Sequence, residues 1–511
     1  MSKKLNVLFI MTDQHRADHM GCTGNSIIKT PNLDKLASDG IRFSNAFCTS
    51  PMCMPNRATL LTGYFPNVHG VRSNGINLSD DVPTITDTLT KKGWHTAAFG
   101  KLHLQFWSPP YKRRYKSAEC WGDWMATELA NNPVRENFPI PYYGFKEVEM
   151  ISGHGIYCTG HYMQWLEERY PEYMKTLKKR FKKVDNFFLL YDKSDLPEEL
   201  YSTTYVKNRT IAYLERHARG DYGEKPFFIH CSFPDPHHPI CPPGKYEQMY
   251  KSEDIDLPES FSDLSNLYDH PFLGNYLRNP LFRGAMIRES TEEEVRKFIS
   301  LTYGSMTMID HAIGEILASL EKLGHANNTI VIYTSDHGDL MGDHGLLLKG
   351  PSPFKGVLKV PLIWKIPEQK RNLVSDSLIS SIDIPKTILE LLHINPRHHP
   401  PKMQGIDFSP VFRDPLKKLR NSCLIMEDEE LGPNGPLIIK LRHLITETYK
   451  LTIYDDINDY GDLYNRKDDP YELNNLYDSS NHQGVRNDLL DKMIHALLNS
   501  EGRFPERIAG V

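Results

Sequence analysis

The fold is decided by the stretch LNVLFIMTDQ, residues 5–14. An almost wholly apolar run, Leu5–Met11, leads directly into the polar residues Asp13 and Gln14. A run of this length and composition is typical of a strand buried on both faces of a parallel sheet. In open parallel sheets, ligands bind beyond the carboxyl ends of the strands. The stretch therefore predicts a first buried strand that delivers Asp13 and Gln14 to a functional site.

Further apolar runs of similar length recur along the chain and alternate with helical patterns. The clearest helix starts near Glu292, where Thr291 and Glu294 resemble a capping box, and it ends at Gly324. Alternation of this kind predicts an α/β fold in which helices cover a parallel sheet. The other strand-like runs are His95–Phe99, Phe227–Ser232, Thr329–Thr334 and Pro361–Trp364.

The alternation changes after about residue 415. Three strand-like runs precede a last helix near Val485–Leu498; the runs are Ser422–Met426, Leu437–Ile439 and Lys450–Ile453. We predict a catalytic domain at 1–415 and a smaller α+β subdomain with an antiparallel sheet at 416–511. Within the predicted catalytic domain, we expect the Pro- and aromatic-rich region at about 105–200 to be an insertion that shapes a substrate entrance.

Composition narrows the functional classes. The 511 residues are 40% hydrophobic and 24% charged, with a net charge of -5, so no global basic field favours nucleic acid or an anionic membrane. No run approaches the roughly 20 apolar residues of a membrane span, and the first apolar run is too short for a secretory leader. We therefore expect a cytoplasmic protein. Its eight cysteines form no CxxC pair, and most lie in apolar runs typical of a core.

Polar residues follow four of the predicted strands. Two ends carry carboxylates beside neutral ligands, which suit a hard divalent cation, and two carry lysine or histidine, which suit an anion. Each residue alone has an ordinary explanation, because an Asp after a strand often caps a turn and a Lys can extend to solvent. Together the four ends predict a metal-assisted site for an oxyanion ester. They are Asp13-Gln14, Gly100-Lys101-Leu102-His103, Pro236-His237-His238-Pro239 and Ser335-Asp336-His337-Gly338.

A candidate nucleophile lies in the stretch CMPNRATLLTG, residues 53–63. Proline disfavours helix in the residue before it, so we expect an extended segment before Pro55 and a first helical turn at Ala58–Leu61. The free N–H groups of that turn would favour negative charge at Cys53, and Arg57 could hold an oxyanion. A buried core cysteine beside a helix start is the alternative, but Cys-x-Pro-x-Arg followed by Leu-Thr-Gly is far more specific than a lone cysteine.

This motif resembles the signature of the formylglycine-dependent sulfatases, in which the cysteine is oxidised to 3-oxoalanine (formylglycine). The resemblance covers nearly the whole chain and implies an alkaline-phosphatase-like fold, with a mixed, mostly parallel sheet and a C-terminal subdomain. It implies a sulfuric ester hydrolase that releases sulfate and an alcohol. The other matching blocks are Asp13-Gln14, Pro31-Asn32-Leu33-Asp34, Gly100-Lys101-x-His103, Pro236-His237-x-Pro239, Ser335-Asp336-His337-Gly338, Lys349, Asp462-Leu463-Tyr464 and Asp469-Pro470-x-Glu472-x-Asn474-Asn475-Leu476.

The resemblance also implies a role for each site residue. A divalent metal, expected to be calcium with magnesium or manganese left open, would bind Asp13, Gln14, Asp336, His337 and formylglycine at Cys53. Many relatives have Asp at the position of Gln14, Asn at that of His337 and Ser at that of Asn56.

The implied nucleophile is a hydrated aldehyde, whose one hydroxyl attacks sulfur and whose other loses a proton as sulfate leaves. Arg57, Lys101 and Lys349 would offset the charge of the sulfuryl oxygens, and His103 would act as base. His237 and Lys349 would face the leaving oxygen, one of them supplying its proton. Asn74 either touches the anion or is a turn residue.

Two other functions stay open at this point. Phosphonate monoester and phosphodiester hydrolases share the Cys-x-Pro-x-Arg nucleophile, but they place hydroxyl side chains where this chain has Lys101 and His103. A non-catalytic binder of sulfated ligands would keep Cys53 unmodified. For a sulfatase we expect a small sugar, aryl or alkyl sulfate as substrate, and a formylglycine-generating or anaerobic maturation enzyme as partner.

Overall fold

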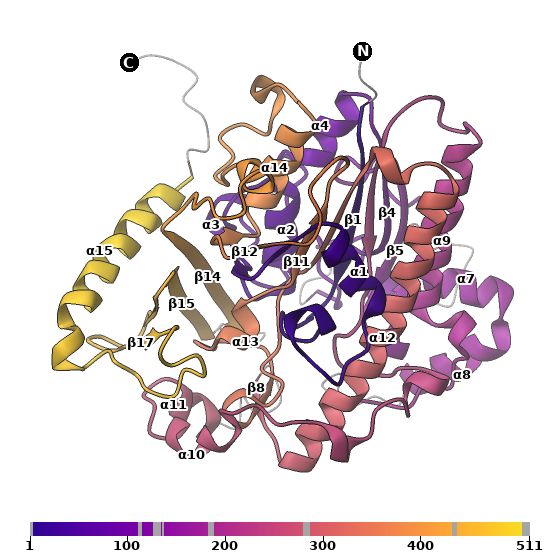
Figure 1. The fold of residues 1–511 in the computed structure, drawn as a ribbon. Coiled ribbons are helices and arrows are strands. Elements are labelled where there is room, and N and C mark those ends of the chain that lie inside the picture. The colour runs from indigo at the N-terminus through magenta and orange to yellow at the C-terminus, as the bar shows by residue number, and fades with distance from the viewer. Residues whose placement is uncertain are drawn as a thin grey trace.

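A nine-stranded, mostly parallel sheet forms the centre of the molecule (Figure 1). The structure, a computed structural model, describes residues 4–110, 115–125, 134, 137–181, 189–278, 287–431 and 437–502. The strand order is β12-β2-β11-β9-β1-β7-β4-β5-β6. The α/β class expected from the alternating pattern is therefore confirmed.

The central strand is β1 (Asn6–Thr12), which pairs in parallel with β7 (Phe227–Ser232) and β9 (Thr329–Ser335). Next to β7 lies β4 (His95–Lys101), also parallel. Every residue of β1, β7 and β9 is buried, which explains why these strands appear in the sequence as nearly continuous apolar runs. The carboxyl ends of four neighbouring strands thus meet at one edge.

The fifth predicted strand, β11 (Leu362–Lys365), runs antiparallel to β9 and so makes the sheet mixed. Beyond it lie β2 (Ile41–Phe43) and β12 (Leu373–Ser375). Two short pairs stand outside the main sheet: β3 (Ala46–Phe47) with β13 (Ile379–Ser380), and β8 (Ile287–Glu289) with β10 (Leu346–Leu348).

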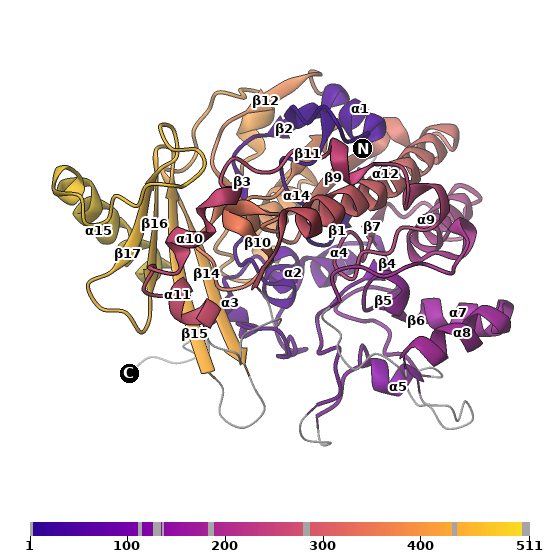
Figure 2. The same cartoon turned by 90° about the horizontal axis from the view of Figure 1, so that it is seen from below.

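Helices cover both faces of the sheet. On one side α12 (Glu292–Lys322) packs on α1 (Pro31–Asp39) and α9 (Ser202–Ala218) (Figures 1 and 2). The Thr291 hydroxyl accepts from the N–H of Glu294, so the predicted capping box is confirmed. On the other side α2 (Cys53–Thr62) packs against α3 (Pro66–His69), α4 (Ile85–Lys91) and α14 (Asp383–Leu391).

The region at 105–200, part of which lies outside the described residues, adds strands to the main sheet. β5 (Glu147–Ser152) pairs in parallel with β4, and β6 (Thr159–Gly160) closes that edge. Our sequence pattern did not mark either strand, because Pro and aromatic residues crowd their surroundings. The helices of the region are α5 (Trp121–Met125), α7 (His161–Arg169) and α8 (Pro171–Phe181).

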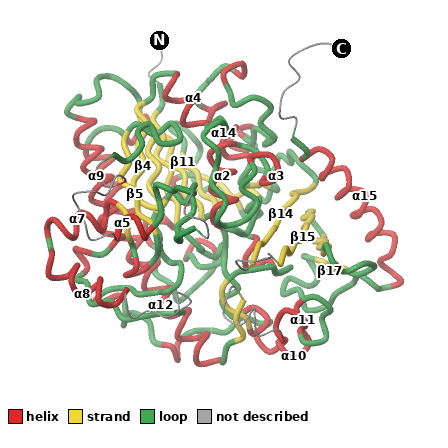
Figure 3. The backbone as a smooth tube through the Cα atoms, turned by 180° about the vertical axis from the view of Figure 1, so that it is seen from behind, coloured by secondary structure: helices red, strands yellow, loops and turns green. Residues whose placement is uncertain are grey.

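A separate four-stranded antiparallel sheet forms the C-terminal part, and helix α15 (Gln483–Ser500) lies beside it (Figure 3). Its strands follow chain order: β14 (Ser422–Leu431), β15 (Leu437–Thr446), β16 (Tyr449–Tyr454) and β17 (Gly461–Asn465). The expected antiparallel sheet and last helix are present, with strands longer than the apolar runs indicated. The remaining short helices are α10 (Leu264–Leu267), α11 (Leu273–Arg278) and α13 (Lys355–Leu358). In the described part of the chain, no helix has both the length and the apolar character that crossing a membrane requires.

A buried ion pair links the C-terminal sheet to the main body. Lys450 Nζ lies 2.6 Å from Glu472 Oε1, and both side chains are almost fully buried. The second oxygen of Glu472 accepts from the N–H of Lys355, 2.8 Å away, at the start of α13. Removing one partner of a buried pair leaves the other charge uncompensated.

We predict that Glu472→Ala lowers the apparent free energy of unfolding by about 3–5 kcal/mol, the cost of a buried unpaired charge. Urea unfolding followed by circular dichroism measures it. The matched control is Glu447→Ala, which breaks an exposed pair with Lys467 and should cost less than about 1 kcal/mol. Equal losses in the two variants would contradict the linking role of Glu472.

Candidate active site

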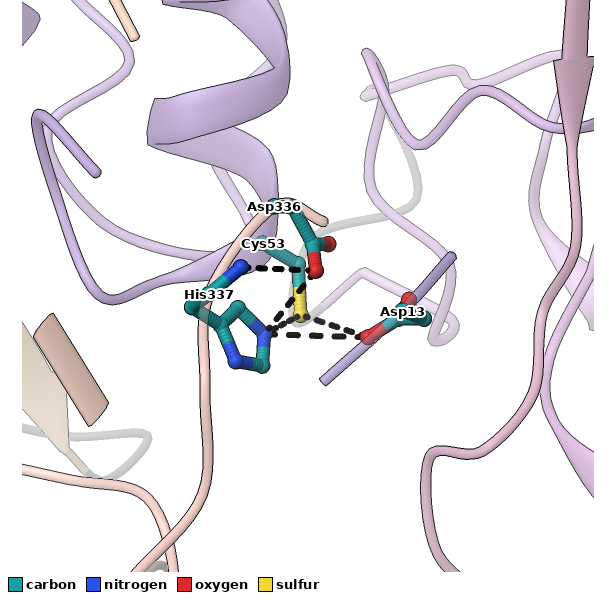
Figure 4. A group of neighbouring side chains, drawn as sticks. All are labelled: Asp13, Cys53, Asp336 and His337. Atoms are coloured by element: carbon teal, nitrogen blue, oxygen red, sulfur yellow. Dashed lines mark hydrogen bonds and ion pairs between the residues drawn. The ribbon is translucent and has the colours of Figure 1, made fainter. Parts of the chain in front are cut away.

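Four side chains converge where the carboxyl ends of the central strands meet (Figure 4). Asp13, Cys53, Asp336 and His337 are buried, and one potential ligand atom from each lies within 4.8 Å of the others. Cys53 Sγ is 3.2 Å from His337 Nε2 and 3.9 Å from Asp13 Oδ1. The structure therefore brings together the proposed nucleophile and three of its predicted neighbours.

The strand register explains this convergence. Thr12 of β1 pairs with Ser335 of β9, so Asp13 and Asp336 leave the sheet side by side. The backbone N–H of Gln14 donates to Asp336 Oδ1 at 3.1 Å, which ties the two loops together. Gln14 itself has φ 63, a left-handed conformation uncommon outside glycine.

The helix that carries the nucleophile begins earlier than expected. We predicted an extended segment before Pro55, but α2 starts at Cys53, and the extended residue is Met52. Proline is tolerated here because the first N–H groups of a helix have no intrahelical acceptor, so its missing N–H removes no helical hydrogen bond. Cys53 thus occupies the first helical position, where the N-terminal dipole favours negative charge more directly than predicted.

Two asparagines hold this helix start in place. Asn56 accepts from the N–H of Thr49 at 3.0 Å and donates to the carbonyl of Asp336 at 2.5 Å. Asn74 accepts from the N–H of Met54 at 3.0 Å. Its side-chain carbonyl therefore satisfies a free donor of the first helical turn, and anion contact by Asn74 stays a prediction.

Arg57 contacts the ends of four adjacent strands. Its Nε lies 2.7 Å from Asp336 Oδ2 and its Nη2 3.1 Å from Asp13 Oδ2. Its Nη1 donates to the carbonyl of Lys101 at 2.8 Å and to Ser232 Oγ at 3.1 Å. These partners follow or end β9, β1, β4 and β7, so one buried guanidinium fixes the whole edge.

The surrounding cations keep the two carboxylates ionised. Burial raises the pKa of Asp13, but Lys101 and Arg57 outweigh that effect and hold the pKa well below its usual range. Burial likewise raises the pKa of Asp336, and Arg57 reverses the shift. Both groups are therefore available as anionic ligands.

Lys101 lies on the side of the site next to β4. Its Nζ donates to Asp13 Oδ2 and lies 2.6 Å from His154 Nε2. His154 stacks on His237, with ring centroids 3.6 Å apart. Sequence reasoning missed His154, although Gly153-His154-Gly155 directly follows a strand; the signal was lost because β5 itself was not recognised.

Lys349 lies against the candidate nucleophile. Its Nζ is 2.7 Å from Cys53 Sγ, 2.7 Å from His337 Nε2 and 3.2 Å from His237 Nε2. His237 Nδ1 lies 2.6 Å from the carbonyl of His238, to which it donates its proton, so Nε2 faces Lys349 as an acceptor. Burial, with His154 and Lys349, places the pKa of His237 well below its usual value, so this ring is neutral.

His103 is held by a buried carboxylate that we did not predict. Glu119 accepts from the backbone N–H groups of His103 and Leu104 at 2.7 and 2.9 Å. This loop gives His103 a φ of 55. No hydrogen bond reaches His103 Nδ1 from the described residues. Burial lowers the pKa of His103 well below its usual value, as does the positive charge of Lys101.

The donor set fits a divalent cation. Asp13 and Asp336 supply carboxylate oxygens, which hard cations prefer. Gln14 Oε1 is buried and has no hydrogen-bond partner in the described part of the chain, while Gln14 Nε2 is held by Asp339 at 2.5 Å. His337 Nδ1 lies 2.8 Å from the carbonyl of Gly338, so its Nε2 faces the site, where it contacts Cys53 and Lys349 and could bind a cation instead. An unpartnered oxygen beside two carboxylates is the arrangement a bound cation would complete.

Family models and a curated relative match this chain over most of its length. The family model described as Sulfatase matches residues 5–394, and the model described as N-sulphoglucosamine sulphohydrolase, C-terminal, matches residues 342–499. An arylsulfatase from Clostridium perfringens is 29% identical over 98% of this chain and 95% of its own.

Solved structures show the same fold over nearly the whole chain. A phosphonate monoester hydrolase from Agrobacterium radiobacter has a TM-score of 0.77 at 22% identity, covering 98% of this chain and 96% of its own. A protein in complex with its substrate D-glucosamine-2-N,6-O-disulfate has a TM-score of 0.71 at 20% identity, covering 98% of both chains. The family match over most of the sequence leads to one conclusion: the chain belongs to the sulfatase family of the alkaline phosphatase superfamily and is a sulfatase.

Proposed function

We propose that this protein hydrolyses sulfate monoesters with formylglycine at position 53 and one divalent metal, Ca²⁺ in preference to Mg²⁺ or Mn²⁺. The observation that carries the proposal is the position of Cys53 Sγ. It lies at the first residue of α2, 2.7 Å from Lys349 Nζ and 3.2 Å from His337 Nε2. In the mature enzyme, an oxygen of the oxidised residue would stand where Sγ stands.

Two further groups, a cation and a hydrated aldehyde, would supply chemistry here. A cation held by Asp13, Gln14, Asp336 and His337 would offset negative charge on the sulfuryl oxygens. A hydrated aldehyde at position 53 would supply one hydroxyl for attack on sulfur and a second for release of sulfate.

The chain's own cations prepare the site for an anion. Lys101, Lys349 and Arg57 carry three positive charges against the two carboxylates of Asp13 and Asp336. This local excess of positive charge occurs in a protein whose net charge is -5. Binding of a sulfate ester therefore depends on the cluster and not on a long-range field. Lys101 and Lys349 can each hold a sulfuryl oxygen.

The leaving oxygen needs a proton, and the tautomer of His237 selects the donor. His237 has its Nδ1 proton committed to a backbone carbonyl and presents an unprotonated Nε2. Burial lowers the pKa of Lys349, but Cys53, Asp13 and Asp336 outweigh it and the net shift is upward. We therefore assign proton donation to Lys349, with His237 orienting its ammonium group. His103, neutral and without a partner at Nδ1 among the described residues, is the assigned base for the second step.

The first prediction concerns the modification. When the protein is coexpressed with a formylglycine-generating or anaerobic maturation enzyme, the peptide that contains Cys53 should lose its sulfur and gain an aldehyde. Mass spectrometry of that peptide measures the change. Cys53→Ala should abolish turnover of p-nitrophenyl sulfate while the unfolding temperature stays near that of the parent. A fully active protein with an intact thiol would refute the proposal and favour a different nucleophile; an inactive binder with an intact thiol would favour the non-catalytic alternative.

The second prediction concerns the metal. Asp336→Asn removes a charged ligand and the partner of Arg57, so both metal content and activity should fall. We expect a decrease in kcat/KM of about 10²–10³-fold, the scale of losing a key electrostatic contact. Metal content after dialysis, measured by mass spectrometry of the ions, gives a readout independent of activity. Full activity in the chelator-treated parent protein would contradict a catalytic metal.

The third prediction separates the roles of Lys101 and His103. Lys101→Ala should lower kcat/KM for p-nitrophenyl sulfate through lost transition-state binding. His103→Ala should slow only the second step, so a burst of p-nitrophenol would exceed the sulfate released in the same interval. If neither variant changes the kinetics beyond about two-fold, both residues only brace their loop.

The same assay tests the phosphorus-ester alternative, since a phosphonate monoester hydrolase shares the fold. The parent enzyme should show a higher kcat/KM for p-nitrophenyl sulfate than for the p-nitrophenyl ester of phenylphosphonate under the same metal and pH. The reverse order would replace the proposed activity by phosphonate ester hydrolysis.

A further inference from the structure

Strand β14 of the C-terminal sheet lies along the nucleophile side of the main body, at the near edge of its sheet (Figure 2). The N–H of Met426 donates to the carbonyl of Thr49 at 2.9 Å, and the N–H of Glu430 donates to Ser73 Oγ at 3.3 Å. Thr49 and Ser73 belong to the two segments that flank the start of α2. The residues between Met426 and Glu430 are thereby placed beside the active site.

Strand alternation aims two acidic side chains inward. Successive side chains of a strand point to opposite faces, so Glu427 and Glu429 share one face and Glu430 takes the other. Glu427 is 0% exposed and Glu429 is 1% exposed. Glu430 is partly exposed and pairs with Arg72 at the surface. Glu427 and Glu429 are therefore buried, whereas Glu430 reaches the surface.

One carboxyl oxygen of Glu429, Oε1, is buried without a hydrogen-bond partner among the described residues. A buried carboxyl in that condition costs on the order of 1–3 kcal/mol or more. Glu427 Oε1 is likewise unpartnered among the described residues, but Glu427 Oε2 lies 3.4 Å from His443 Nε2, within the C-terminal sheet.

Glu429 interacts electrostatically with its neighbour Glu427 and with groups of the active site. Burial raises the pKa of Glu429 to about 8, Lys349 lowers it and Cys53 raises it. Lys349 is also the group assigned to the leaving oxygen, and the contacts of β14 with Thr49 and Ser73 place Glu429 beside the same site. A hydrogen-bond donor or a cation on the substrate would stabilise the ionised form of this carboxyl group.

We propose, on the basis of the sulfatase function proposed above, that Glu429 is a specificity residue that binds a hydroxyl or amino group on the alcohol part of the substrate. The partnerless Oε1 accepts a hydrogen bond from that group once the ester is bound. The substrates favoured are then sulfate esters of polyhydroxylated or amino-bearing alcohols, such as sugars. An aryl sulfate without such a group occupies the reacting centre but leaves Glu429 unpaired.

The test compares Glu429→Gln with the parent on two kinds of ester. The substrates are p-nitrophenyl sulfate and a panel of monosulfated glucose and glucosamine isomers, which separates hydroxyl from amino recognition. Glutamine keeps the shape, so folding should be preserved, and Glu429→Ala with thermal unfolding checks this. Glu430→Gln, on the opposite face of the same strand, is the matched control.

We expect Glu429→Gln to lower kcat/KM for the best sugar sulfate about tenfold or more, because a site built to bind a polar group discriminates through that group. Hydrolysis of p-nitrophenyl sulfate should stay within about two-fold, as should both substrates in Glu430→Gln. The unsulfated sugar product should also inhibit p-nitrophenyl sulfate hydrolysis less in Glu429→Gln than in the parent.

Three results would overturn the proposal: equal losses on both substrates in Glu429→Gln, no loss on either, or a parent enzyme that cleaves the aryl sulfate and none of the sugar sulfates. A parent enzyme inactive on every sulfate ester would instead refute the function on which the proposal rests.

Discussion

The structure depends on one buried guanidinium. Arg57 reaches from α2 to the ends of four adjacent strands, through Asp336, Asp13, Ser232 and the carbonyl of Lys101. Two carboxylates side by side in a low-dielectric interior repel each other, and each raises the pKa of the other. A planar cation that bonds to both lets them stay ionised, and its attachment to α2 fixes the nucleophile at the same point. The contacts of Arg57 therefore both position the candidate nucleophile and stabilise this edge of the sheet.

Two stacked histidines connect the remaining cations. Lys101 contacts His154, which stacks on His237, and Lys349 contacts both His237 and position 53. Neutral imidazoles beside ammonium groups add acceptors without adding repulsion. The pKa of each histidine in the stack is lowered chiefly by burial, with the neighbouring lysines contributing in the same direction. Such a site can bind an anion and still offer a lone pair where a proton must move.

The C-terminal sheet contributes more than an outer layer. Through Glu472 it holds the start of α13, a few residues after Lys349, and through β14 it places Glu429 beside the candidate active site. In the proposed mechanism the central sheet supplies the groups that act on the ester, and the second sheet supplies the proposed specificity residue.

The sequence by itself determined the central strands, the long capped helix and the residues that converge at the candidate site, because each depends on local pattern: apolar runs that end in polar residues, a capping box, and a short motif around Cys53. It misplaced the start of α2, since the preference of a residue before proline is weaker than the tertiary contacts of Asn56 and Asn74. It missed His154, Glu119 and Glu429, which lie at irregular or unremarkable positions in the chain. Only the tertiary structure decided their roles, because a carboxyl or imidazole gains its function from the charges and free donors that distant segments bring to it.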